Sequence, residues 1–220
     1  MLGVLALTVV TGALAVSLPE QIAHIGGSLF FGIGFVLIVV GRSELFTENF
    51  LVPVAGVLRG DGRARDIGRL WALTMLGNVA GLVLLAAIFS RAGLVPPETL
   101  EAAGQTADTL AARDLLTAFL SAVVAGATMT LFTWLSEAVE LDVSRVLIAL
   151  IIGFLLAAPT LNHAVVSIGE MLFGLFAGTT DKASWTDLAQ NVPVAIAGNL
   201  VGGLGLVTVW RLVQMRGEPD

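Results

Sequence analysis

An apolar stretch from Val146 to Gly178 is interrupted near its middle by a polar run, and this interruption constrains the fold most. The stretch has 33 residues, whereas a helix needs only about 20 to cross a bilayer. Within it, Pro159 precedes Thr160-Leu161-Asn162-His163-Ala164, and proline favours a break because it lacks an N–H and clashes with the preceding turn. An imidazole at mid-depth is costly unless it faces protein or a wet cavity. We therefore expect His163 at the centre of a pore, beside a broken helix.

The composition is that of a membrane protein. Of the 220 residues, 56% are hydrophobic and 13% are charged, whereas a soluble domain carries about 25% charged residues. We therefore predict an all-α, multi-pass membrane protein in contact with the lipid bilayer. The chain has no Cys, which excludes disulfides and thiolate metal sites, and its formal charge of −6 gives no sign of nucleic-acid binding. We expect neither a cofactor nor a bound metal ion.

Six apolar blocks divide the chain, and two of them have an unusual length. The blocks are 1–17, 26–58, 70–90, 114–135, 146–178 and 192–214. The second and the fifth are too long for one span, too short for two helices and a loop, and polar near the middle. Two half-helices joined by irregular backbone around a cavity account for these properties. The polar residues of the second block are Arg42, Ser43, Glu44, Thr47, Glu48 and Asn49.

A short motif predicts an internal repeat. Gly77-Asn78-Val79-Ala80-Gly81 in the third block returns as Gly198-Asn199-Leu200-Val201-Gly202 in the sixth, 121 residues later. The same offset places His163 opposite Arg42, so the two breaks coincide. Three spans in each repeat give the halves opposite orientations, a pattern typical of transporters and channels. We predict one transmembrane domain over 1–220 with inverted repeats over about 1–90 and 114–214. Each asparagine of the motif either packs helices together or lines the pore.

Basic residues indicate the orientation. Four arginines lie in segment 59–69. With six spans, Arg145, Arg211 and Arg216 lie on the same side of the membrane as this segment. Arg91, Arg113 and Lys182 lie on the opposite side. This bias predicts that both termini are cytoplasmic. We expect 91–113 and 179–191 to be outward loops with little function. The first block begins at residue 1 without a basic segment, so we expect no signal peptide and leave open whether a natural N-terminal extension precedes it.

His163 and Thr47 are the leading site candidates. Because histidine changes charge near neutral pH, His163 can pass a proton to a bound anion and take it back. The alternative is a structural imidazole that holds the broken backbone together. Thr47 can offer its hydroxyl to a substrate, cap the second half-helix of its block, or do both. Leu45 and Phe46 can form an apolar constriction.

The charged residues of the long blocks have structural interpretations. Arg42 is close enough in sequence to pair with Glu44 or Glu48, and we expect that ion pair. Glu170 lies seven residues after His163, two turns along the same helix face. It either pairs with a cation or takes part in proton movement, and we favour the pairing.

These features resemble the formate/nitrite transporter family. The likeness covers essentially the whole chain and rests on three motifs: Glu44-Leu45-Phe46-Thr47 after a Gly-rich half-helix, the His163 run, and Gly198-Asn199-Leu200-Val201-Gly202-Gly203. It implies an aquaporin-like fold of six spans with the second and fifth broken, assembled as a homopentamer with one pore in each protomer. It also implies that small monovalent anions such as formate, nitrite or hydrosulfide, or the neutral acids, cross the inner (plasma) membrane.

The resemblance implies roles for individual residues. His163 becomes the central pore residue and proton donor, and Thr47 faces it from the other break. Four further residues complete the pore: Leu45 and Phe46 at the cytoplasmic constriction, Phe30 at the outer one, and Asn199 nearby.

Three positions depart from the family pattern. Family members often have a small residue in place of Glu48, and formate channels carry Glu or a similar residue in place of Asn162. Some members place a Lys before the fourth span, where this chain offers only Arg113. These departures leave the substrate open.

Two other functions are alternatives. An aquaporin-like channel for water or small neutral solutes would lack the paired Asn-Pro-Ala motifs of such channels. An intramembrane enzyme would use Thr47 or Ser167 as nucleophile and His163 as base, within about 3 Å of each other. No hydrolase motif supports the enzyme, and we expect no enzymatic activity.

Overall fold

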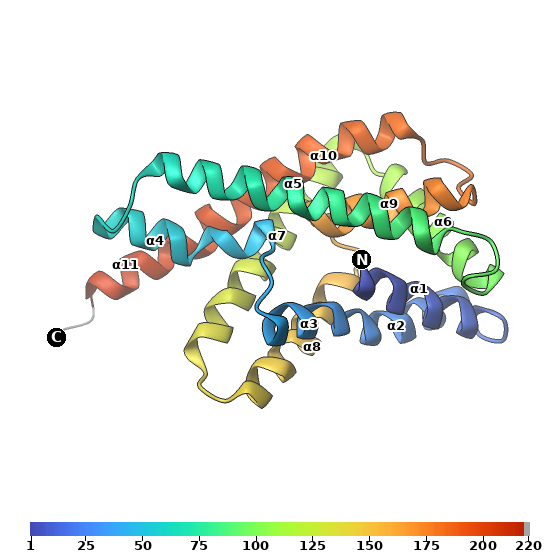
Figure 1. Cartoon of the computed structure of the whole chain (residues 1–220), viewed down its shortest axis with the longest axis horizontal. Helices are drawn as coiled ribbons and strands as arrows, with labels where there is room; N and C mark the ends of the chain where they lie inside the picture. The colour runs from blue at the N-terminus through green and yellow to red at the C-terminus, as the bar shows by residue number, and fades with distance from the viewer. Residues whose placement is uncertain (218–220) are drawn as a thin grey trace.

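The computed structural model describes the backbone of residues 1–217 and the side chains of residues 1–214, and helices make up most of it (Figure 1). Arg216, which the orientation prediction includes, lies outside the described side chains. Within this part no strand is present, and one isolated bridge joins Ala92 and Val95. The all-α prediction is confirmed. The elements are α1 Leu2–Ala15, α2 Glu20–Phe31, α3 Ile33–Gly41, the 3-10 helix η1 Phe46–Phe50, α4 Val52–Arg59, α5 Ala64–Phe89, α6 Pro97–Ala111, α7 Leu115–Ala138, α8 Asp142–Ala157, α9 Ala164–Ala177, α10 Trp185–Leu200, the π-helix η2 Val201–Thr208 and α11 Val209–Gly217.

Four helical segments of the described chain have the length and composition to cross a membrane. They are Glu20–Gly41, Ala64–Phe89, Leu115–Ala138 and Trp185–Gln214. The first joins α2 and α3 through Gly32, and the last joins α10, η2 and α11. Leu2–Ala15 and Ala164–Ala177 are shorter apolar helices.

Both predicted interruptions are present. In the second block residues 42–51 separate α3 from α4, and in the fifth block residues 158–163 separate α8 from α9. Arg42 and Thr160 follow the first half-helix of each block in the left-handed conformation, with φ of 49° and 51°. Over the described backbone they are the two non-glycine residues with positive φ, so the chain leaves both half-helices in the same way.

Helix α7 packs closely on the helix of the sixth block. Gly126 of α7 lies against the backbone of Asn199, and Gly202 of η2 lies against the backbone of Val123. A Cβ at either glycine would overlap these backbone atoms, and small residues permit such close contacts in membranes. Gly205, also in η2, has no atom within 4 Å of the place where a Cβ would be.

Segment 91–113 is not the loop that the sequence predicts. It contains α6, which packs against α9 and α1 through a buried face of small residues: Thr99, Ala102, Ala103, Gly104, Thr106, Ala107 and Leu110. The Ala and Thr residues that suggest a loop instead give a helix surface that allows close packing. Asp108 accepts hydrogen bonds from the backbone N–H groups of Asp181, Lys182 and Ala183 at 2.9, 2.8 and 2.7 Å. Helix α6 therefore also fixes the connection that precedes α10.

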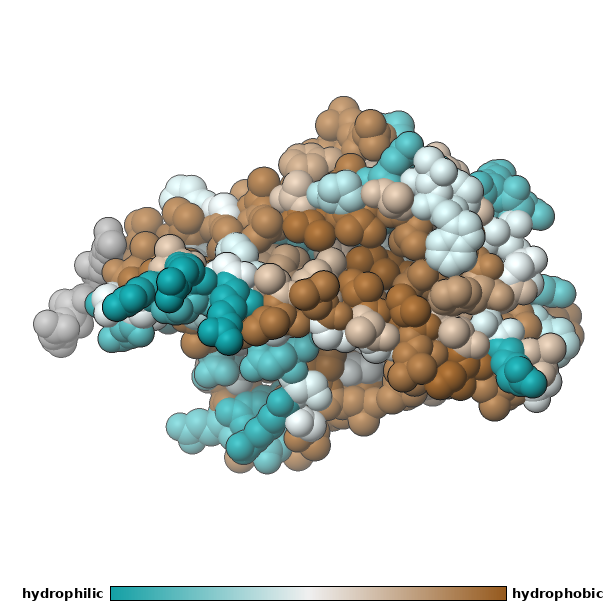
Figure 2. All heavy atoms as spheres, turned by 45° about the horizontal axis from the view of Figure 1, so that its top comes forward, coloured by the Kyte–Doolittle hydropathy of each residue, from teal (hydrophilic) through white to brown (hydrophobic). Residues whose placement is uncertain are grey.

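Apolar side chains cover much of the outer surface (Figure 2). In the membrane-length part of α5 only 11% of the residues are buried, and Leu73, Leu76 and Leu84 are among its exposed side chains. An exposed apolar surface of this kind is favourable where it contacts lipid or another protein. Figure 1 places the turn between α4 and α5, which carries the arginines, at the same end as α11, and α6 at the opposite end.

We expect Gly202→Ala to lower the free energy of unfolding by about 1–3 kcal/mol, because the added methyl overlaps the α7 backbone. Gly205→Ala is the matched control, since its methyl enters open space in the same helix, and should change stability by at most about 0.5 kcal/mol. Thermal unfolding of the purified protein measures both variants. Equal destabilisation would contradict the packing of η2 on α7.

Asp108 lies outside the candidate membrane spans and makes stability depend on pH. Partial burial would raise the pKa of its carboxyl, but three backbone N–H groups and the Lys182 ammonium outweigh this, so the pKa lies below its ordinary value. The carboxylate thus contributes stability that is full at neutral pH and lost as the pH falls through the lowered value.

Asp108→Asn should therefore destabilise the 181–183 segment at neutral pH by about 1–2 kcal/mol. Relative to their intrinsic exchange rates, these amides should exchange faster in this variant at neutral pH. In the natural protein they should lose this protection only at pH values below the ordinary range of an aspartate carboxyl. Glu101→Gln, at an exposed position of the same helix, is the control. Exchange that Asp108→Asn leaves unchanged would show that this carboxylate does not hold the segment.

Candidate functional site

Thr47 and His163 meet where the two breaks face each other. The hydroxyl oxygen of Thr47 lies 2.7 Å from Nε2 of His163, and both side chains are fully buried. Thr47 belongs to η1, and His163 directly precedes α9, 116 residues later. The tertiary fold therefore brings these two predicted residues into direct contact.

The hydrogen bonds of His163 define which ring nitrogen carries hydrogen. Nδ1 lies 3.1 Å from the backbone nitrogen of Val166, whose N–H can only donate, so Nδ1 is the acceptor. The hydrogen of the neutral imidazole is then on Nε2 and points at Thr47 Oγ1. Since that oxygen already accepts this bond, the Thr47 hydroxyl hydrogen can be donated to another acceptor.

Asn199 satisfies the backbone at the fifth-block break. Its Oδ1 accepts a hydrogen bond from the N–H of Ala164 at 2.9 Å, and its Nδ2 donates to the carbonyl of Asn162 at 3.1 Å. Nδ2 also donates to the carbonyl of Ala122 on α7 at 2.8 Å. Backbone groups left free by a helix break need such internal partners within a membrane. Asn199 therefore both packs helices and holds the site.

Asn78 makes the equivalent pair of hydrogen bonds at the other break. Its Oδ1 accepts from the N–H of Phe46 at 3.0 Å, and its Nδ2 donates to the carbonyl of Glu44 at 3.1 Å. The contacted residues differ by 118 between the breaks (44 to 162, and 46 to 164), whereas the asparagines differ by 121. Leu45, rather than Arg42 as expected, therefore corresponds to His163.

Asn162 fixes the fifth-block break to its neighbours. It forms a reciprocal amide pair with Asn191 of α10, at 2.8 and 3.0 Å, and donates to the carbonyl of Ala118 at 3.1 Å. Its backbone N–H donates to Ser121 Oγ at 3.0 Å. A carboxylate has no hydrogen to donate and could not form the reciprocal pair, so the amide at this position is part of the packing.

Glu48 supports the first break locally, and Thr47 does not cap a half-helix. Oε2 of Glu48 accepts a hydrogen bond from the N–H of Leu45 at 3.2 Å, which satisfies this backbone group at the start of η1. Thr47 lies inside η1, and α4 begins after Leu51. The alternative in which Thr47 caps the second half-helix is therefore wrong, and the Thr47 hydroxyl is available to His163.

The ion pair expected for Arg42 does not form. Among the side chains of residues 1–214 no carboxylate pairs with Arg42, and Glu44 instead accepts a hydrogen bond from Asn49 Nδ2 at 3.1 Å. Arg42, Glu44 and Glu48 line a shared cavity of about 420 Å³ together with Arg145. Arg42 therefore shares a cavity with both glutamates without contacting either as an ion pair.

Two other cavities approach His163. The first, the polar cavity, has a volume of about 360 Å³ and is lined by residues that include Thr11, His24, Gln105 and Thr160. The second, the apolar cavity, has a volume of about 230 Å³ and is lined by residues that include Val4, Phe31, Leu45 and Val165.

His163 lies in the barrier between these cavities. Along α1, α2 and the fifth-block break, the residues that line one cavity are separated from those that line the other by buried residues. Leu7, Ser28 and His163 occupy these intermediate positions and are at most 1% exposed. His163 therefore lies among the buried residues that separate the two cavities.

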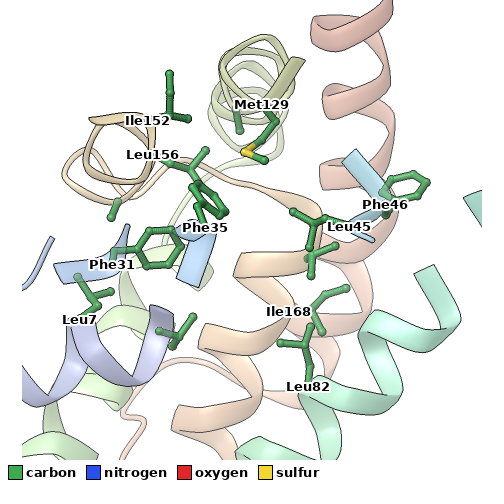
Figure 3. Packing of buried hydrophobic residues seen from close by; sticks show 14 of the residues in the cluster. Leu7, Phe31, Phe35, Leu45, Phe46, Leu82, Met129, Ile152, Leu156 and Ile168 are labelled. Carbon is green, nitrogen blue, oxygen red and sulfur yellow. The ribbon is translucent and has the colours of Figure 1, made fainter. Parts of the chain in front are cut away.

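Phe31, not the predicted Phe30, takes part in this barrier. Phe30 is 46% exposed, whereas Phe31 is 3% exposed and its ring centroid lies 5.5 Å from that of Phe35 (Figure 3). Phe31 continues the buried positions Ala23 and Gly27 at a spacing of four. This helical period was the signal that could have selected it.

Leu45 and Phe46 enter different surroundings. Leu45 is 8% exposed and lines the apolar cavity, on the side of Ile168 in Figure 3. Phe46 points away from Leu45 and packs edge-on against Phe50 and Trp71, with centroid distances of 5.2 and 6.4 Å. Leu45 therefore faces the cavity, and Phe46 anchors η1 against α5.

Glu170 is enclosed by the fold. It is 3% exposed, and one of its carboxylate oxygens has no hydrogen-bond partner among the described residues. Arg113 lies close enough for electrostatic attraction to this carboxylate. The Arg113 guanidinium itself donates to the carbonyl of Thr160 at 2.7 Å and to Ser121 Oγ at 3.3 Å. The expected pairing of Glu170 with a cation therefore acts through space, without an ion pair at contact distance.

The site does not have the form of a hydrolytic pair. A general base needs a free nitrogen lone pair directed at the nucleophile, but Nε2 of His163 carries the hydrogen toward Thr47. Ser167 Oγ makes no hydrogen bond among the described residues. Within the same residues no group of three or more His, Asp or Glu could hold a metal ion. The chemistry available is hydrogen-bond donation in a buried barrier.

Known proteins are similar to this chain in sequence and in fold. The family model described as formate/nitrite transporter matches residues 1–213. The inner membrane protein YfdC of Escherichia coli (strain K12) is 25% identical over 195 residues, which cover 87% of this chain and 61% of that protein. The chain therefore spans about three fifths of the length of this relative.

Two solved structures have similar folds. A structure titled FNT family ion channel superposes with a TM-score of 0.83 at 18% identity, over 96% of this chain and 85% of the other. A pentameric formate channel with formate bound superposes with a TM-score of 0.69 at 17% identity, over 97% and 95% of the two chains. These two structures show a shared fold. The match of the family model to residues 1–213 shows that the chain belongs to the formate/nitrite transporter family.

Proposed function

We propose that this protein forms a transmembrane pore for small monovalent anions such as formate or nitrite, or for the corresponding neutral acids. The contact between Thr47 and His163 carries the proposal, because it joins the two breaks inside the barrier between two cavities. Family membership supports the substrate class. The pore is a passage and not an enzyme site, since neither buried group is activated as a nucleophile.

An anion in the barrier would accept hydrogen bonds from Thr47 O–H and His163 Nε2–H. Such charge-assisted bonds are strong where water is excluded. Transfer of a proton from His163 to the anion requires a second ring proton, because loss of the Nε2 hydrogen alone would leave an imidazolate. That proton must enter at Nδ1, which now accepts the N–H of Val166. Proton-coupled passage therefore requires His163 to release the start of α9.

We assign this function to a homopentamer of protomers with six spans in two inverted halves. The matching hydrogen bonds of Asn78 and Asn199 support the inverted repeat. The pentameric formate channel of similar fold supports the assembly. The sparsely buried α5, where Gly77 and Gly81 face open space in the single chain, offers a surface for lipid or a neighbouring subunit.

The proposed location is the inner membrane, with both termini in the cytoplasm. YfdC is named an inner membrane protein. The arginine-rich turn and α11 lie at one end of the molecule (Figure 1), and positive charge favours the cytoplasmic side. On this assignment the polar cavity, which residues of α6 line in part, lies on the outer side.

Uptake of formate, nitrite, acetate and hydrosulfide into proteoliposomes tests the proposal. We expect at least one of these anions to enter with the natural protein, and His163→Phe to abolish entry. Thr47→Val should slow entry about tenfold, because it removes one hydrogen bond to a charged solute, and Thr47→Ser should restore most of it. Natural protein that moves none of these anions at any pH from acid to neutral would refute the function.

Phe31 should limit the size of the solute. We expect Phe31→Leu to raise acetate entry severalfold relative to formate, because a smaller side chain then occupies the apolar barrier. Phe30→Leu makes the same chemical change on the exposed surface and should leave the ratio unchanged. The ratio of the two initial uptake rates is the measurement. A larger effect at Phe30 would place the constriction elsewhere.

A further inference from the structure

His24 lies where the polar cavity meets the fifth-block break, and it is one of only two histidines in the chain. We infer that His24 is a positioning residue through which the pH of the polar cavity controls the break that carries His163. The transport consequence rests on the proposed function. The structural consequence, a contact between α2 and the end of α8 that strengthens on protonation, does not.

The contacts of His24 define its protonation chemistry. Nε2 lies 3.2 Å from the carbonyl oxygens of both Ala157 and Ala158, and 3.3 Å from Thr160 Oγ1. Carbonyl oxygens only accept, so Nε2 carries hydrogen in the neutral and the charged ring alike. The nitrogen that gains a proton is therefore Nδ1, and the contact with α8 persists while its charge changes.

The carbonyl oxygens at the end of α8 face His24. Ala157 is the last residue of α8 and Ala158 is its C-cap, so these carbonyls form the negative end of the helix dipole. A cationic imidazole at a helix C-terminus is stabilised by this end and makes stronger hydrogen bonds to its carbonyls. Because histidine ordinarily changes charge between about pH 5 and 8, acidification should tighten the junction of α2 and α8.

The junction controls the break through Thr160. Thr160 is in the left-handed conformation, which is unfavourable for a non-glycine residue and persists only where its surroundings hold it. Its hydroxyl lies beside His24, and its carbonyl accepts a hydrogen bond from the Arg113 guanidinium at 2.7 Å. The residue is thus held from two sides, and His163 follows three residues later.

The charges around His24 are few. Glu20 lines the same cavity from α2, and Arg113 reaches the break from the opposite side of Thr160. The cavity linings from α1 and α6 consist of uncharged residues: Thr11, Ala102, Gln105, Thr106 and Thr109. Protonation of His24 is therefore the main change of charge that acidification of this cavity makes next to the break.

The tightened junction favours the arrangement seen in the structure, in which the barrier is closed and His163 is fully buried. Acid in the polar cavity should therefore slow passage, and replacement of His24 should relieve this slowing. His24→Gln retains an N–H donor of similar reach and cannot gain a proton. Gln21→Ala, a neighbouring lining position, is the matched control.

Exchange of labelled formate at equal pH on both sides of proteoliposomes tests the transport consequence without a proton gradient or an orientation bias. We expect the ratio of His24→Gln to natural rates to be about 3 near pH 5.5 and to approach 1 near pH 8. The corresponding ratio for Gln21→Ala should not vary with pH. A pH-independent ratio for His24→Gln, while the natural protein exchanges formate, would overturn the inference and leave the proposed function standing.

A labelling experiment decides the structural consequence even if no anion is transported. The chain has no cysteine, so Ala158→Cys introduces a single thiol at the lining of the polar cavity. Its maleimide labelling rate is measured with and without His24→Gln, and the ratio at each pH cancels the ionisation of the thiol. We expect labelling about threefold faster with His24→Gln near pH 6, converging near pH 8. A constant ratio would overturn the inference by itself.

Discussion

A helix that is broken inside a membrane must find internal partners for the backbone groups that the break frees. In this protein two asparagines supply them, each accepting one N–H and donating to one carbonyl of a break. The remaining features depend on this solution. With the backbone satisfied, both breaks can approach each other closely enough for Thr47 and His163 to share a hydrogen bond at 2.7 Å.

The central imidazole is held as a neutral donor. Its Nδ1 caps α9 and its Nε2 faces the threonine hydroxyl, so the two available hydrogens converge on the barrier between two cavities. Apolar side chains such as Leu7 and Phe31 close the rest of that barrier. A small anion that enters this region can accept hydrogen bonds from these two side chains. The same geometry links any full proton transfer to a movement of His163 away from α9.

Much of this arrangement could be predicted from the sequence because it depends on length and polarity. Blocks of excess length with polar centres can be satisfied only by broken helices, and a buried histidine in one of them marks the site. Details that depend on which side of a helix faces inward could not be derived in the same way. Phe30 and Phe31 are adjacent, and only the buried period through Ala23 and Gly27 separates them.

Other parts of the site depend on tertiary contacts that leave no local pattern. His24 contacts α8 across 133 residues, and Arg113 reaches Thr160 across 47. Helix α6 is rich in Ala and Thr, and its composition alone resembles a loop. The expected ion pair of Arg42 does not form, although Arg42 lines one cavity together with Glu44 and Glu48.

The protonation state of His163 and its response to an anion test the central claim most directly. With only two histidines in the chain, ¹⁵N-histidine solid-state NMR in lipid bilayers can assign each ring by comparison with His24→Gln. We expect His163 to be neutral at neutral pH, with hydrogen on Nε2 and none on Nδ1, and added formate or nitrite to shift the His163 signals. Hydrogen on Nδ1, or His163 signals that no small anion perturbs, would contradict it.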